Sequence, residues 1–276
     1  MFIFNCSTMI INSIVSCITK KHHDVWKYTS VYLNKYIKAE NYYVISPSHE
    51  VNLLKDITPK NFFILNEEDV IPLKYKEQGF WTHRWGGWIY QQFLKIEAAS
   101  VLGPRVLIWD GDTVPLKNME NIFFPTEECV QVFTGEEYHE PYFQTLKHLL
   151  HLPKRLVDFS FIAQCLPIYS QDINVFKIFL KTMHKIDWKD AITHSLKCSK
   201  TIDRFSEYET LGNFILQQNL RKIITFNGSW ERNGWEHISC WEDINNLTEK
   251  DMYFCSFEQW QRPQDFKAKL TEIKVK

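Results

Sequence analysis

The stretch Val106-Leu107-Ile108-Trp109-Asp110-Gly111-Asp112-Thr113 decides how the chain folds and where its chemistry lies. Its apolar first half predicts a buried strand, and two carboxylates separated by a glycine follow directly. In an open α/β sheet, ligands gather at the carboxyl ends of the strands, so both acids are expected at the ligand-binding edge. Gly111 lets the backbone turn there and lets a ligand approach closely.

The carboxylates of Asp110 and Asp112 repel each other unless a positive charge lies between them. Mn²⁺ or Mg²⁺ prefers oxygen ligands of this kind and also binds diphosphates. We therefore expect a divalent cation held by Asp110 and Asp112, which neutralises a departing nucleoside diphosphate. The alternative is a solvated surface turn, since many such turns contain two acids at this spacing.

Strands and helices alternate around this stretch. We expect strands at 10–19, 42–46 and 62–65 and helices at 25–38 and 88–102, the latter bounded by glycine before it and Gly103-Pro104 after it. This order predicts βαβ units, hence an α/β fold with a mainly parallel, mixed central sheet flanked by helices. Further on, we expect strands at 129–133, 159–168, 222–226 and 252–257, and helices at 141–151, 172–186 and 207–218.

The composition narrows the function classes. The 276 residues carry 32 basic and 33 acidic side chains, so we expect no nucleic-acid partner held by bulk charge. Ten Trp, twelve Tyr and twenty Phe either fill a core or stack on sugars. The seven cysteines are scattered without a CxxC pair, which favours a reducing, cytoplasmic location over zinc or disulfide chemistry. Polar residues interrupt the apolar N-terminus, so we predict a strand there and no transmembrane segment.

Residues 87–95 (GWIYQQFLK), followed by 106–113, resemble the core of GT-A-type glycosyltransferases, which are nucleotide-diphospho-sugar transferases of bacterial polysaccharide and virus-type systems. Three further stretches resemble the family in the same order: 139–150 (HEPYFQTLKHLL), 160–163 (SFIA) and 205–214 (FSEYETLGNF). Together the matches span roughly residues 9 to 260. One departure is that the family often has histidine where this chain has Gln164 and Cys165.

The resemblance implies a single GT-A-like, Rossmann-like domain over residues 1–276. A nucleotide-sugar-binding half would occupy about 9–115, and an acceptor-side half with a C-terminal lid about 116–276. Asp112 would coordinate the metal, Asp110 would reach the metal or the donor ribose, and residues 14–19, ending at Thr19, would hold the nucleoside. The donor would be a UDP-sugar, or alternatively a GDP-sugar, and the acceptor a glycan, glycoprotein or glycolipid.

Glu207 is the candidate catalytic residue. Ser206-Glu207-Tyr208-Glu209 fits a capping box, in which Ser206 caps a helix and Glu209 reaches back to Ser206. Glu207 is left in the first turn, where three roles are open: general base on an acceptor hydroxyl, acceptor binding, or interaction with the helix dipole. A base would suit an inverting transfer.

Other candidates for donor and metal binding are more widely spread. Gln92 and Lys95 share a helix face, from which Lys95 would contact phosphate unless it is solvated. Arg84 lies in a Gly- and Trp-rich loop that could close over the donor. His237 would be a further metal ligand, as in several metal-dependent sugar transferases, and its loop, 227–242, is the candidate lid. The acidic run at 67–69 would either contact the nucleoside or be solvated.

Two other classes compete with this interpretation. A strand ending in Asp-Gly-Asp-Thr also resembles the first motif of haloacid-dehalogenase-like phosphatases, with Asp110 as nucleophile and Asp112 as acid. That fold normally opens with this strand, whereas about a hundred residues precede it here. The abundant aromatic residues also suit a non-catalytic carbohydrate-binding protein, which would need no metal–diphosphate site.

Overall fold

The computed structural model describes residues 9–72, 75, 86–197, 205–264 and 266. Its central sheet has the order β3-β2-β1-β4-β7. The strands are β1 (Ile11–Cys17), β2 (Ala39–Ser46), β3 (Phe62–Asn66), β4 (Arg105–Trp109) and β7 (Cys165–Tyr169). β7 pairs with β4 antiparallel and the other pairings are parallel. The expected α/β fold with a mainly parallel, mixed sheet is therefore confirmed.

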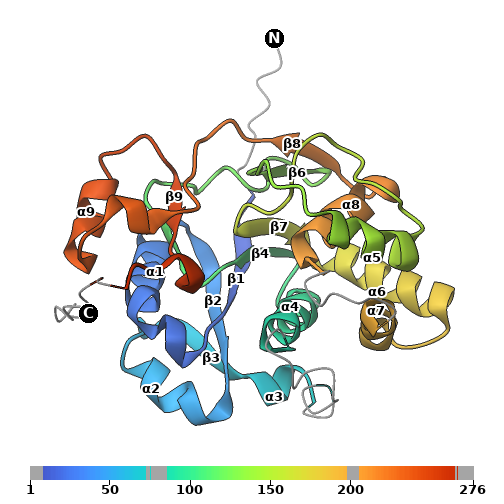
Figure 1. Ribbon diagram of the computed structural model, residues 1–276, viewed down its shortest axis with the longest axis horizontal. Coiled ribbons are helices and arrows are strands. Elements are labelled where there is room, and N and C mark those ends of the chain that lie inside the picture. The colour runs from blue at the N-terminus through green and yellow to red at the C-terminus, as the bar shows by residue number, and fades with distance from the viewer. Residues whose placement is uncertain (1–8, 73–74, 76–85, 198–204, 265, 267–276) are drawn as a thin grey trace.

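Helices flank this sheet, and two small sheets lie beside it (Figure 1). The small sheets pair β5 (Thr113–Pro115) with β9 (Phe254–Ser256) and β6 (Cys129–Val132) with β8 (Lys222–Thr225). The longer helices are α1 (His23–Tyr36), α4 (Gly86–Ala99), α5 (Glu140–Leu150), α6 (Ser170–His184), α7 (Trp188–Lys197) and α8 (Glu207–Gln217). The shorter ones are α2 (Val51–Lys55), α3 (Glu67–Val70) and α9 (Ile244–Leu247).

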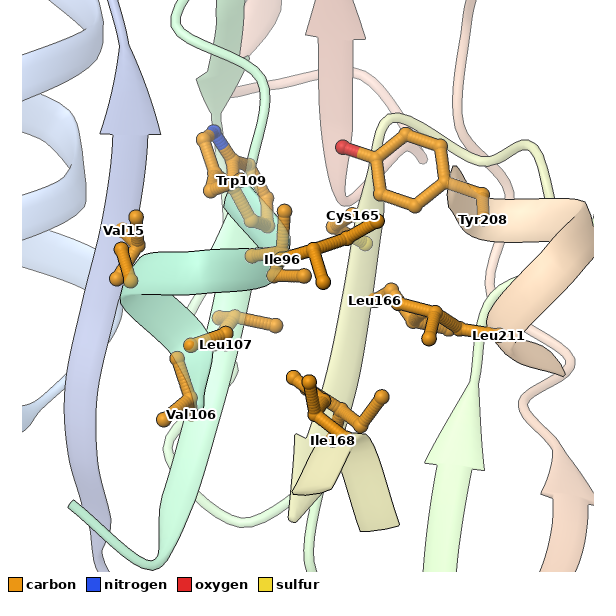
Figure 2. Packing of buried hydrophobic residues seen from close by; sticks show 14 of the residues in the cluster. Val15, Ile96, Val106, Leu107, Trp109, Cys165, Leu166, Ile168, Tyr208 and Leu211 are labelled. Atoms are coloured by element: carbon orange, nitrogen blue, oxygen red, sulfur yellow. The ribbon is translucent and has the colours of Figure 1, made fainter. Parts of the chain in front are cut away.

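The main core lies between the central sheet and the helices that pack on it. β4 is apolar and buried from Val106 to Trp109, as expected for a strand covered on both faces. Figure 2 shows Ile96 of α4 beside β4 and β7, and Tyr208 and Leu211 reaching from α8 toward β7. This packing fixes α4 and α8 beside the carboxyl end of β4, where Asp110 follows.

A second apolar cluster joins α1 to the C-terminal part of the chain. Tyr28 of α1 stacks on Trp241, with ring centroids 5.2 Å apart, and Val114 of β5 belongs to the same cluster. Trp235 and Trp241 are both buried in it. The candidate lid at 227–242 is therefore packed through two of its tryptophans, and its closure over a donor stays a prediction.

The predicted strand over 159–168 is wrong in its first half. Only Cys165–Tyr169 forms a strand, and Gln164 before it has a left-handed φ of 60°. The backbone bends because Glu209 on α8 accepts hydrogen bonds from the Ser160 hydroxyl and the Phe161 amide. Local hydrophobicity could not distinguish this buried, bent segment from a buried strand.

Smaller differences concern short elements. The sequence interpretation missed α7 and the short strand β5, which is completed only by pairing with β9, far away in the chain. The acidic run expected after β3 forms the short helix α3, whose first turn is capped by the Asn66 side chain accepting from the Glu68 amide. Within the described residues, no helix has the length and apolar character needed to cross a membrane.

Candidate active site

The Asp110–Asp112 turn is fixed by backbone hydrogen bonds from two distant segments. The Asp110 amide donates to the Gln164 carbonyl at 2.9 Å, and the Phe257 amide donates to the Asp112 carbonyl at 2.8 Å. The Thr113 amide closes the turn on the Asp110 carbonyl at 3.0 Å. The two acids therefore lie where β4, β7 and β9 meet, at the carboxyl end of β4.

Gly111 is required at this turn by a close approach of the chain itself. A Cβ built on Gly111 would lie 1.9 Å from Ile18 Cδ1, 2.9 Å from Ile18 Cγ1 and 3.3 Å from the Cys17 carbonyl oxygen. The close contact anticipated for a ligand is thus made by the end of β1. Glycine therefore allows the turn to pack against the end of β1.

Lys95 lies at the centre of a buried charged cluster beneath the turn. Its side chain is 2% exposed. Its ammonium donates to Asp110 Oδ1, to Glu207 Oε1 at 2.8 Å and, at 3.4 Å, to the Tyr208 hydroxyl oxygen. The Tyr208 hydroxyl in turn donates to Asp110 Oδ1 at 2.7 Å. The Lys95 ammonium therefore links Asp110 to Glu207, the candidate base.

The electrostatics of this cluster favour a charged Lys95. Burial acts to lower the pKa of Lys95, but the carboxylates of Asp110 and Glu207 overcome this effect and raise it. Burial raises the pKa of Glu207, Lys95 opposes that shift, and Asp110 adds to it. The sequence interpretation placed Lys95 near phosphate or in solvent, whereas the structure places its ammonium between two carboxylates.

The start of α8 is held in place by its own cap and by α4. Ser206 caps the helix as predicted, accepting from the Glu209 amide at 3.3 Å. The Glu209 carboxylate does not reach back to Ser206, because it accepts instead from Ser160 at 2.5 Å and from Asn213 at 3.0 Å. The Glu207 amide donates to Gln92 Oε1 at 2.9 Å, so the predicted candidates Gln92 and Glu207 are in direct contact.

Among the residues that the structure describes, Asp112 has no ion-pair partner that is charged at neutral pH. Its one ion-pair contact there is the His22 ring, with Nε2 4.0 Å from Asp112 Oδ2. Burial lowers the pKa of His22 to about 3, so the ring is neutral. Burial, followed by repulsion from Asp110 and Glu258, raises the pKa of Asp112 to about 7. Although its side chain is 17% exposed, this carboxylate lies in an excess of negative charge.

Some carboxylate oxygens at this turn have no side-chain partner. Within the described part of the chain, no side-chain donor hydrogen-bonds Asp110 Oδ2 or the Asp112 carboxylate, although the Asp112 amide bonds its own carboxylate. Both side chains are partly exposed. Hard oxygen ligands with uncompensated charge are what Mn²⁺ or Mg²⁺ prefers, and each ion usually keeps several waters or phosphate oxygens as well. The two acids therefore fit a divalent cation.

Glu258 is a third acid near the turn that the sequence interpretation missed. It follows β9, and its Oε1 accepts from Gln164 Nε2 at 3.1 Å and from Arg232 Nε at 2.9 Å. Arg232 also pairs with Glu137. No local pattern marks Glu258, because it reaches Asp112 only through the β5–β9 pairing.

Several buried polar atoms near the ends of β1 and β2 have no hydrogen-bond partner in the described residues. They include the hydroxyl oxygens of Ser16, Thr19 and Ser46 and the amide nitrogen of Gln92. Buried polar groups normally find partners, and unpaired atoms of this kind also occur elsewhere in the described residues, for example Thr145 Oγ1 and Trp188 Nε1. Thr19 and Gln92, both predicted to contact the donor, belong to this set.

The remaining candidates are less closely connected to the turn. Arg84 lies outside the described residues. The His237 ring contacts Lys250 through Nδ1 at 2.9 Å and Glu231 through Nε2 at 3.6 Å. Among the described residues, no group of three or more His, Cys, Asp and Glu side chains is arranged to hold a metal. The role of His237 as a further metal ligand stays a prediction.

Comparison with solved structures defines the class of fold. The mouse xyloside xylosyltransferase 1 structure, in its apo form, matches with a TM-score of 0.51 and 11% sequence identity. The match covers 92% of this chain and 100% of that chain. The fold is therefore that of a glycosyltransferase-like domain.

The chain belongs to a family of unknown function, DUF6492, which matches residues 11–274. A comparison with curated proteins gives no significant match.

Proposed function

We propose that this protein is a metal-dependent glycosyltransferase, which moves a sugar from a nucleotide-diphosphate sugar to a hydroxyl of a glycan, glycoprotein or glycolipid. The observation that carries the proposal is the pair of open carboxylates, Asp110 and Asp112, at the carboxyl end of β4. Asp110 is paired with Lys95, whereas Asp112 lies in an excess of negative charge, which favours a bound cation. The glycosyltransferase-like fold makes a nucleotide sugar the natural partner of that cation.

In this proposal Asp112 would bind Mn²⁺ or Mg²⁺ directly and Asp110 would contribute Oδ2. Lys95 and Tyr208 both bind Asp110 Oδ1, which orients the carboxylate and leaves its other oxygen available. The metal would neutralise the charge that develops on the leaving diphosphate. Lys95 then acts by positioning Asp110, rather than by contacting phosphate itself.

The orphaned polar atoms at the ends of β1 and β2 would contact the donor nucleoside. Thr19 Oγ1 and Ser46 Oγ are buried and unpaired, and Gln92 Nε2 is an unpaired donor on α4. A nucleoside offers both donors and acceptors, which would satisfy these groups. We favour a UDP-sugar donor, with a GDP-sugar as the second choice.

Glu207 is the proposed general base on the acceptor hydroxyl, in an inverting reaction. Its carboxylate shares Lys95 with Asp110, so it belongs to the same site. Burial raises its pKa, in the direction that makes a carboxylate a better proton acceptor. Lys95 would stabilise the carboxylate before transfer.

The test is a thermal-shift screen of UDP-, GDP-, CMP- and dTDP-sugars with and without Mn²⁺, followed by assays of donor hydrolysis and transfer. A donor at about a hundred times its Kd adds about 2.7 kcal/mol, which raises the Tm of a domain of this size by about 5–10 °C. We expect this shift with Mn²⁺ and its loss in Asp112→Asn.

Asp56→Asn, an exposed change after α2, is the matched control and should keep the shift. An unchanged Mn²⁺-dependent shift and full turnover in Asp112→Asn would refute the metal assignment. Phosphate release from a phosphomonoester would support the phosphatase alternative, and the absence of any nucleotide effect would support a non-catalytic protein.

A further inference from the structure

Trp260 differs from the other described tryptophans in its exposure. Its side chain is 75% exposed, whereas Trp26, Trp109, Trp235 and Trp241 are almost completely buried. It lies in the short helix η6 (Gln259–Gln261) that follows β9. No aromatic or cationic side chain of the described residues covers its ring. Isolated exposed apolar side chains are common on protein surfaces, so what marks Trp260 is the way its ring is held.

The segment that carries Trp260 is anchored at both ends. Before it, the Phe257 amide donates to the Asp112 carbonyl. After it, the Arg262 guanidinium donates to the Asp24 carboxylate at 2.6 Å and lies 5.2 Å from the Trp235 ring. Figure 1 shows this C-terminal segment beside α1. Trp260 is three positions after Phe257, so its Cα lies within roughly 11 Å of that anchor.

The indole itself is oriented by a rigid support. Trp260 Nε1 donates to Glu258 Oε2. Glu258 is only 9% exposed, and its other oxygen accepts from Gln164 and Arg232. The Trp235 indole donates to the Glu258 carbonyl at 2.9 Å. The ring is therefore held at its N–H edge while its faces stay open to solvent.

Arg232 binds the same carboxylate as the Trp260 indole and supplies polar chemistry there. Its Nε pairs with Glu258 and its Nη1 with Glu137, whereas Nη2 has no partner in the described residues. An open aromatic face suits the C–H face of a pyranose, and a guanidinium donor beside it suits sugar hydroxyls. A preorganised ring also binds at a lower entropic cost than a mobile one.

We infer that Trp260, with Arg232 beside it, forms a binding subsite for a pyranose ring of the acceptor. The inference rests on the proposed function, which places the donor at Asp110 and Asp112. In that proposal the nucleoside contacts the unpaired polar atoms at the ends of β1 and β2. Glu258, which holds the Trp260 indole, also binds Arg232, and Arg232 pairs with Glu137 in the second half of the chain. A sugar stacked on Trp260 would lie at the rim of the site, where an acceptor must enter.

Saturation-transfer NMR with a panel of methyl pyranosides tests the inference. At least one pyranoside should receive saturation at its ring C–H protons in the wild-type protein. Trp260→Ala should weaken its binding by about three- to tenfold, the size expected for one aromatic contact. Trp260→Phe should stay within about threefold of the wild type, since a ring face remains. Ile178→Ala, at an exposed position on α6, is the control and should change nothing.

A parallel thermal-shift measurement with UDP and Mn²⁺ separates this inference from the proposed function. Trp260→Ala should keep the nucleotide-induced shift. Loss of that shift would show that the ring stacks on the nucleobase and would overturn the acceptor assignment. So would unchanged pyranoside binding in Trp260→Ala, or no pyranoside binding by the wild type. Pyranoside binding through Trp260 without any nucleotide shift would leave the subsite standing and reject the transferase.

Discussion

Replacing Lys95 with methionine gives the sharpest test of the buried cluster. The substitution keeps most of the side-chain volume and removes the cation that contacts Asp110 and Glu207. Breaking a buried ion pair by removing one partner costs about 3–5 kcal/mol, because an uncompensated charge stays buried. For a domain of this size, that loss lowers Tm by roughly 10 °C.

The pH dependence of that loss identifies its cause. Burial already raises the pKa of Glu207, and Lys95 opposes that shift. Without Lys95, the pKa of Glu207 rises further above its unfolded value, so the folded state binds more protons. Stability of the variant should therefore fall as pH rises from about 4 toward neutrality. In the wild type, the pKa of Lys95 is raised, so its contribution is complete at and below neutral pH and constant across this window.

Chemical denaturation at pH 5 and pH 8 measures both effects. Lys177→Met is the control, since it removes a partly exposed partner of Glu97 and should cost at most about 1 kcal/mol. Adding Glu207→Gln to Lys95→Met should restore part of the stability, because one buried charge is then removed. A loss below about 1 kcal/mol, or one that is equal at both pH values, would refute the buried-charge reasoning.

The remaining predictions concern the candidate base and the turn. Glu207→Gln should lower transfer by about 10²–10⁴-fold while sparing the nucleotide-induced thermal shift; equal loss of both in the same protein would indicate a positioning or donor-binding role. Gly111→Ala should cost about 1–3 kcal/mol in urea denaturation, because its Cβ would overlap the buried Ile18 side chain. Gly87→Ala has nothing within 4 Å of its added Cβ, and an equal cost there would contradict the steric argument.

Much of the site could be predicted because it follows from local order along the chain. An apolar run that ends in Asp110-Gly111-Asp112 predicts a buried strand, which the structure confirms, and a ligand-binding edge, which stays a prediction. Ser206 was identified as a helix cap from its position in a short pattern, and the structure confirms that cap. The periods of helices and strands, together with their start and stop signals, are local properties.

The partners of those residues were decided only by the tertiary structure. Lys95 and Glu207 are 112 positions apart and meet because α4 and α8 pack beside β4. Glu258 comes near Asp112 only because β9 pairs with β5. The bend before β7 exists because Glu209 reaches it from another helix. A sequence pattern records which face of an element is apolar, but which buried charges neutralise one another depends on how distant elements pack.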